Sequence, residues 1–151
     1  MSFSIGFLDG SLSYPYDDPA TPCAGGVLIL SESEEHFGSS LYQWSKKDYE
    51  SQWRDAIKTL LNGQKRAALI TEYVGPEAAT HLEWWPMYVV GNEVFIQNQL
   101  LFYDQLREPF SAQRAFSFLS DRCMTNEEGK RISEWAVTIS EVEKFARTLL
   151  L

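Results

Sequence analysis

The sequence predicts an α+β fold: a single domain over residues 1–151, with an antiparallel or mixed sheet and helices packed mainly on one face. Three observations lead to this prediction. Apolar side chains recur at helical spacing after Ser45, they alternate with polar side chains between Ser133 and Ile139, and Gly91-Asn92 joins two strand-like runs as a hairpin turn would. A chain of 151 residues can bury a sizeable core without a disulfide or a structural metal.

The first 44 residues are expected to form strands separated by polar loops. Phe3–Leu12 is strand-like, whereas Tyr14–Gly26 is rich in Pro, Asp and Gly and predicts a loop. Gly25–Ser31 contains an apolar run long enough for a buried strand. Glu32–Gly38 is then expected to be a turn or a polar edge, and Ser39–Trp44 a short strand.

The clearest element is a helix that begins after Ser45. Ser45 and Asp48 have the spacing of a capping box, although Asp is shorter than the usual Glu or Gln, and Gly63 lies where the helix would stop. Six apolar residues fall on one face at helical spacing: Tyr49, Trp53, Ala56, Ile57, Leu60 and Leu61. This stripe, with Trp53 at its centre, is expected to lie in the core and not to line a ligand pocket.

The middle of the chain predicts a strand and a hairpin. Arg66–Tyr73 is strand-like, and Trp84–Val90 is expected to pair with Glu93–Gln99 through a tight turn at Gly91-Asn92. The turn should be of the II′ kind, because Gly occupies its first position. Pro86 cannot donate a ladder hydrogen bond, so it should lie at a strand start, a bulge or an edge.

The rest of the chain shows weaker signals until a strand and a helix close it. Pro76–Thr80 is expected to be a connection, and Leu100–Leu106 to extend the second strand of the hairpin. Pro109–Leu119 predicts a weak helix or an irregular crossover, and Met124–Gly129 a turn. Ser133–Ile139 then has the alternation of a strand with one buried face. Ser140 and Glu143 have the spacing of a full capping box, which predicts a terminal helix beginning there.

The negative charge is concentrated in the first third of the chain. The net charge is −8, and no Lys or Arg precedes Lys46. Such a segment would repel a nucleic-acid backbone and attract a basic protein. Five carboxylates there are the candidate partner-binding residues: Asp17, Asp18, Glu32, Glu34 and Glu35. The alternative is that these are solvated loop charges that only aid solubility.

No catalytic, metal-binding or cofactor-binding pattern stands out. His36 and His81 are the only histidines, and neither belongs to a metal-ligand spacing or a nucleophile motif. The basic pairs Lys46-Lys47 and Lys65-Arg66 are isolated, which argues against direct binding of nucleic acid. We therefore expect a protein that is not an enzyme and needs no cofactor or metal. The lack of a signal peptide and of a membrane-length apolar run predicts a cytoplasmic location without membrane contact.

Several dispersed blocks resemble the immunity proteins of bacterial contact-dependent growth inhibition systems, the CdiI type. The blocks span roughly residues 40–140 and consist of Trp44-Ser45, Asp48-Tyr49, Gln52-Trp53, Ala56-Ile57, Ala68 to Thr71, Trp84 to Tyr88, Val94 to Asn98, and Ile132 to Trp135. No single block is specific, but together they indicate the family.

The resemblance implies a cytosolic antidote that binds and neutralises the C-terminal domain of a CdiA-type toxin, one to one. Toxins of such systems are often nucleases and frequently basic. The family fixes no common binding site, so no interface residue is transferred from it. The alternative is an acidic secretion chaperone or adaptor, which would also be a cytosolic α+β protein without catalytic activity.

Overall fold

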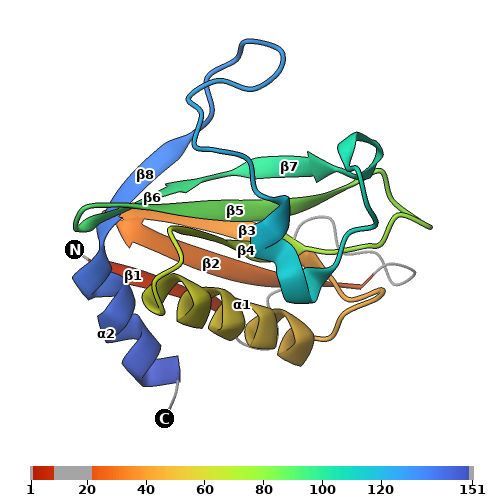
Figure 1. The fold of residues 1–151 in the computed structure, drawn as a ribbon. Coiled ribbons are helices and arrows are strands. Elements are labelled where there is room, and N and C mark those ends of the chain that lie inside the picture. Colours follow the sequence, from red (N-terminus) through yellow and green to blue (C-terminus); the bar gives the residue numbers. More distant parts are fainter. Residues whose placement is uncertain (1, 9–21, 150–151) are drawn as a thin grey trace.

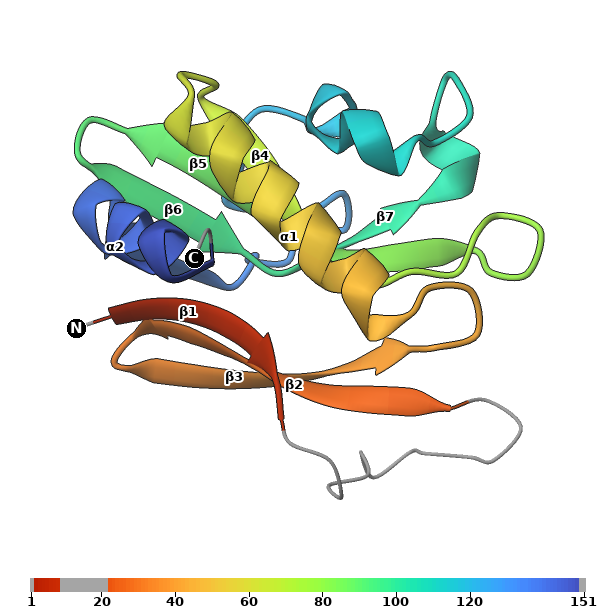
Figure 2. The same ribbon diagram turned by 90° about the horizontal axis from the view of Figure 1, so that it is seen from below.

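The structure is a computed structural model that describes residues 2–8 and 22–149, and their strands form two antiparallel sheets (Figure 1). In chain order the elements are β1 (Ser2–Phe7), β2 (Cys23–Ser31), β3 (Ser33–Ser40), α1 (Lys46–Leu61), β4 (Arg66–Glu72), β5 (His81–Val90), β6 (Glu93–Gln97), β7 (Gln99–Phe102), the 3₁₀ helices η1 (Tyr103–Gln105) and η2 (Ala112–Phe118), β8 (Glu134–Thr138) and α2 (Ile139–Leu149). Both α-helices lie on the same side of the larger sheet (Figure 2). The α+β prediction is confirmed.

The small sheet has the order β1-β2-β3 and contains a hairpin that the sequence pattern did not reveal. β2 already begins at Cys23, so the predicted loop Tyr14–Gly26 is wrong over its last four residues. Glu32–Gly38 is mostly the polar edge strand β3, whereas Ser39–Trp44 is not a separate strand but the end of β3 and a turn. A Cβ atom on Gly26 would lie 2.3 Å from Cζ of Phe37, so only glycine lets this ring lie across β2.

The large sheet has the order β4-β5-β6-β8, and β7 pairs with the first half of β5. Pro86 lies in the middle of β5, between the residues that pair with β7 and those that pair with β6. The amide of Val89 donates to the carbonyl of Lys65 on the β4 side, and amide directions alternate along a strand. The nitrogen of Pro86 therefore faces the other side, where Asn98 interrupts the partner strand, and no ladder hydrogen bond is lost.

Helix α1 lies along β4, and two of its side chains form hydrogen bonds with the backbone at the outer edge of that strand. Gln52 Nε2 donates to the carbonyl of Ala68 at 2.8 Å, and Gln52 Oε1 accepts from the amide of Ile70 at 2.8 Å. Trp53 Nε1 donates to the carbonyl of Ile70 at 2.7 Å. The side-chain amide of Gln52 thus makes the two hydrogen bonds that a neighbouring strand would make, and the sheet edge is covered.

The core forms between the two sheets around α1. Trp53 is 2% exposed, and its ring packs against Phe7 and Phe37 of the small sheet, with ring centroids 5.0 and 5.8 Å away. The prediction that this stripe lies in the core is confirmed for all of its members except Leu61, which is half-buried. β2 also contacts β8, β3 contacts β4, and Phe3 packs edge-on against Phe145 of α2. None of the helices in the described part of the chain is long and apolar enough to cross a membrane.

Helix α2 begins two residues earlier than the sequence pattern predicts. Thr138, the last residue of β8, accepts a hydrogen bond from the amide of Glu141, whose carboxylate accepts from the amide and hydroxyl of Thr138. The capping box is thus Thr138 with Glu141, not Ser140 with Glu143. The strand passes into the helix without a loop, because the amide of Ile139 still donates to the carbonyl of Asn92 in the neighbouring hairpin.

The segment between β7 and β8 covers one face of β5 and β6. The ring of Phe110 packs on Trp84, the hydroxyl of Tyr88 donates to the carbonyl of Ser120, and the guanidinium of Arg122 lies 4.0 Å from the ring centroid of Phe95. Arg122 also makes a two-pronged ion pair with Glu134 of β8, which holds the pKa of that carboxyl below its usual range. These contacts fix η2 beside α1.

Candidate functional site

The acidic candidates that the structure describes lie on the β2–β3 hairpin. Glu32 is exposed in the two-residue turn, and Glu34 is exposed on β3, where one carboxylate oxygen lies 3.5 Å from Nε2 of His36. Glu35 is half-buried and lies opposite the buried Leu28, on the core-facing side. Because successive side chains of a strand point to opposite faces, Glu34 and Glu35 do not share a surface. Asp17 and Asp18 lie outside the described residues.

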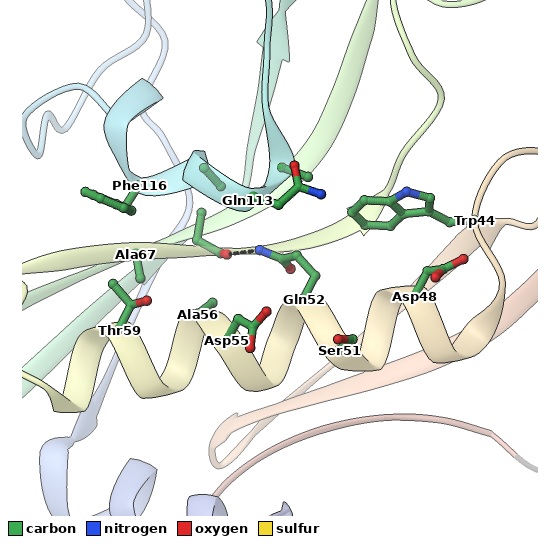
Figure 3. A pocket seen from close by; sticks show the side chains of 13 residues that line it. Trp44, Asp48, Ser51, Gln52, Asp55, Ala56, Thr59, Ala67, Gln113 and Phe116 are labelled. Atoms are coloured by element: carbon green, nitrogen blue, oxygen red, sulfur yellow. Dashed lines mark hydrogen bonds between the residues drawn. The ribbon is translucent and has the colours of Figure 1, made fainter.

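A groove of about 200 Å³ lies between α1 and η2, over the outer edge of β4 (Figure 3). Trp44 lies at one end of the groove and Phe116 at the other. Asp48 and Asp55 project from α1, two turns apart, along one wall, and Gln113 of η2 lies across from them.

The groove exists because small side chains meet where α1, β4 and η2 come together. Five alanines line it: Ala56, Ala67, Ala68, Ala112 and Ala115. Larger side chains at these positions would fill the space between the two helical segments. Gln52 closes the bottom of the groove with its hydrogen bond to the carbonyl of Ala68, so the base is rigid and its polar atoms are already paired.

The charge of the groove is negative and uncompensated by its own lining. Of the thirteen lining residues, Asp48 and Asp55 are acidic and none is Lys or Arg. One carboxylate oxygen of Asp48 accepts from the amide and the hydroxyl of Ser45, at 2.9 and 3.0 Å, as part of the helix cap. The carboxylate of Asp55 makes no hydrogen bond or ion pair with any residue in the described ranges.

A second pair of carboxylates lies where β4 ends and β5 begins. Glu72 is directly opposite Glu83, next to a bulge in β4, and Glu83 accepts from the hydroxyl of Thr71 at 2.8 Å. Withdrawal from water raises the pKa of the Glu72 carboxyl, and the nearby charge of Glu83 raises it further. Like charges that face each other across strands weaken a sheet, so this pair lowers the stability of the fold at neutral pH.

The two histidines lie apart from the groove and make local contacts. His36 is half exposed beside Glu34, and the ring of His81 lies 5.2 Å from that of Phe102, with Nδ1 2.9 Å from the hydroxyl of Thr80. Within residues 2–8 and 22–149, no group of three His, Cys, Asp or Glu side chains could hold a metal ion.

The acidic residues of the β2–β3 hairpin were recognisable from the sequence, whereas the hairpin itself and the groove were not. The groove depends on η2, an irregular segment whose position relative to α1 is set by contacts such as that of Arg122 with Glu134. The available signal was the recurrence of alanine at Ala56, Ala67-Ala68, Ala112 and Ala115, which indicates close approach but not which elements approach.

Comparison with known proteins gives three matches. The family model described as the CdiI N-terminal domain matches residues 39–145. The immunity protein CdiI of Enterobacter cloacae subsp. cloacae is 25% identical over 122 residues, which cover 81% of this chain and 83% of that protein. One chain of the solved CdiA-CT/CdiI toxin and immunity complex from Enterobacter cloacae superposes with a TM-score of 0.83 over 98% of both chains at 23% identity, which shows a shared fold.

Proposed function

The chain belongs to the CdiI N-terminal domain family, and on this premise we propose that it is an immunity protein that binds and neutralises the C-terminal toxin domain of a CdiA-type protein. The family match over residues 39–145 carries the proposal. It is supported by a relative that is itself an immunity protein and by a chain of the same fold in a toxin–immunity complex.

The toxin is a basic nuclease, and the immunity protein acts in the cytoplasm by one-to-one occupancy without turnover. The charge of the chain supports this, since a net charge of −8 favours a basic partner over a nucleic acid. The carboxylates of Asp17, Asp18, Glu32 and Glu34 face the toxin, whereas Glu35 lies on the core-facing side of β3 and contributes little. A nuclease needs positive charge where phosphates bind, and a carboxylate surface competes for that region.

Titration of the chain into the C-terminal domain of its partner CdiA-type toxin tests the proposal. Nuclease activity on RNA and DNA substrates should fall linearly and reach zero near one equivalent of the chain, because each molecule of inhibitor occupies one toxin. Mass measurement by light scattering should give the sum of the two chains. Inhibition at a small fraction of an equivalent would contradict one-to-one occupancy, and undiminished toxicity at excess chain would contradict the proposal as a whole.

A further inference from the structure

We infer that the groove between α1 and η2 is part of the toxin-binding surface and receives one arginine side chain of the toxin domain, with the guanidinium against Asp55. The inference rests on the proposed function, because it assumes that a toxin domain binds this chain. It adds a second contact region, on a different part of the molecule from the acidic hairpin.

The size of the groove fits a side chain better than a small molecule. Sites for metabolites and cofactors usually enclose roughly 300–1,000 Å³. The groove encloses about 200 Å³ and is partly open to solvent. A single long side chain that enters from a partner surface would fill it without the partner having to insert a whole loop.

The charge of the groove selects a cation. Asp48 and Asp55 are its only charged lining residues, and Asp55 lacks a partner among the residues described here. Asp48 keeps one carboxylate oxygen outside the hydrogen bonds of the helix cap. A cation between these residues, which are two turns of α1 apart, would be attracted by both without disturbing the helix cap.

The walls of the groove favour arginine over lysine. Trp44 and Phe116 offer aromatic surfaces at the two ends, and Phe116 is 38% exposed although it is a large apolar residue. A guanidinium stacks on aromatic rings and binds a carboxylate through two parallel hydrogen bonds, whereas an ammonium group is strongly hydrated and does neither as well. The alanines of the floor leave room for the methylene groups of the arginine stem.

The acidic hairpin and the Trp44 end of the groove adjoin opposite ends of β3. Ser33 and Ser40 at the two ends of β3 lie about 23 Å apart, given a rise of roughly 3.3 Å per residue. The hairpin turn adjoins Ser33, and Trp44 follows the Ser40 end. A standard interface covers roughly 800 Å² on each partner, or about 28 Å across, which exceeds the length of β3.

The first experiment removes the charge of the groove. Asp55→Asn keeps the shape of the side chain, and Glu50→Gln, on an exposed position of α1 outside the groove, is the matched control. Calorimetric titration with the toxin domain should show binding that is about ten- to a hundredfold weaker for Asp55→Asn and unchanged for Glu50→Gln, since a charge-assisted hydrogen bond is lost only in the first. Equal affinities for Asp55→Asn and the wild type would overturn the inference.

The second experiment fills the groove with an arginine introduced into α1. Ser51 is exposed, lines the groove, and lies three residues after Asp48 and four before Asp55, so the arginine of Ser51→Arg can reach both carboxylates. This variant should unfold at the same or a higher temperature than the wild type and still bind the toxin domain about tenfold less tightly. A variant that is as stable and binds as tightly as the wild type would contradict an arginine in this groove.

A double-mutant cycle identifies the occupant. Each arginine and each lysine of the toxin domain is replaced by alanine in turn, and its binding to the wild type and to Asp55→Asn is compared. For one arginine, replacement by alanine should abolish the effect of Asp55→Asn, so that this variant and the wild type bind the altered toxin domain equally tightly. Coupling to a lysine alone, or to no residue, would overturn the inference while the binding of the wild-type chain upholds the proposed function. If the wild type itself does not bind, the proposed function fails first.

Discussion

Ser31 and Gly91 hold the same backbone position in two equivalent hairpins. Each is the first residue of a two-residue turn, Ser31-Glu32 between β2 and β3 and Gly91-Asn92 between β5 and β6, and each has a φ of 62°. Glu32 and Asn92 do not have positive φ, which is the pattern of a II′ turn. The predicted II′ turn at Gly91 therefore has a counterpart at Ser31, where a side chain is held in a conformation that favours glycine.

Replacement of Ser31 by glycine is expected to stabilise the protein. Glycine removes the steric penalty of a left-handed residue, which is about 1–2 kcal/mol. Against this, glycine loses more backbone entropy on folding, which costs about 0.5–1 kcal/mol. The net gain in the free energy of unfolding should be up to about 1 kcal/mol. The contact of the Ser31 hydroxyl with the carbonyl of Ala136 is long, at 3.4 Å, and its loss should matter little.

Urea denaturation measures this gain, and Gly91→Ser is the matched control. The control should lose stability by about the amount that Ser31→Gly gains, because it creates the same strain in the second hairpin. A loss of stability in Ser31→Gly would mean that the hydroxyl of Ser31 contributes more than its geometry indicates.

Gln52→Ala is expected to destabilise the protein by about 2–4 kcal/mol. The substitution leaves the carbonyl of Ala68 and the amide of Ile70 without partners at a buried strand edge, and each unpaired buried group costs about 1–3 kcal/mol. Gln113→Ala, an exposed residue of the same groove, should change the free energy of unfolding by less than about 0.5 kcal/mol. Hydrogen exchange at the amide of Ile70 should accelerate in Gln52→Ala only. If its protection is unchanged, β4 does not depend on Gln52.

Glu72→Gln is expected to stabilise the protein at pH 7 by about 0.2–1 kcal/mol, the range for a cross-strand pair. The raised pKa of Glu72 means that the folded state binds its proton more tightly than the unfolded state does. Ionised Glu72 therefore lowers stability above its folded pKa, and this effect disappears as the pH falls below its unfolded pKa, where both states are protonated.

Thermal unfolding of Glu72→Gln and the wild type between pH 3 and pH 8 checks this sign. The two curves should separate as the pH rises. In the Glu83→Gln background the same substitution should stabilise less, because the facing charge is gone. A difference that is largest at pH 3 would refute the assignment.

Charge reversal of the acidic hairpin tests whether it faces the toxin. Glu32→Lys with Glu34→Lys should slow association with the toxin domain by roughly tenfold at low salt and weaken the dependence of the on-rate on salt. Glu35, which lies on the core-facing side of β3, should add little when it is reversed as well. Glu127→Lys with Glu128→Lys makes the same change of charge on a distant exposed loop and should slow association less. Equal on-rates for the two double variants would show that the hairpin lies outside the interface.

Local signals predicted the elements that depend on local interactions. The cap of α1 at Ser45, its aromatic stripe, strand β4 and the β5–β6 hairpin lie close to where the sequence patterns put them, because each is specified by residues within a few positions of one another. The β2–β3 hairpin was missed because Ser31 carries no turn signal at the position where Gly91 does.

Two further differences arose from tertiary contacts. The segment Thr138 to Glu143 contains two overlapping capping boxes, and the one that forms is set by the hydrogen bond of Ile139 to Asn92 in the β5–β6 turn. The groove required η2 to be placed beside α1, which the contacts of Arg122, Phe110 and Tyr88 achieve across long separations in sequence. The separation of Glu34 and Glu35 onto two faces followed only from the strand assignment of β3.

The hydrogen bonds of Gln52 to β4 also bear on the order in which a nascent chain folds. They join residues 16 and 18 positions apart, whereas the contact of Phe3 with Phe145 joins the two ends of the described chain. The entropy lost on closing a loop grows with its length, so α1 can dock on β4 during synthesis. The junction of β1 with α2 is completed last, after the ribosome has released residues 139–149. A chain arrested before residue 134 would hold the Gln52 contacts and leave the ring of Phe3 in water.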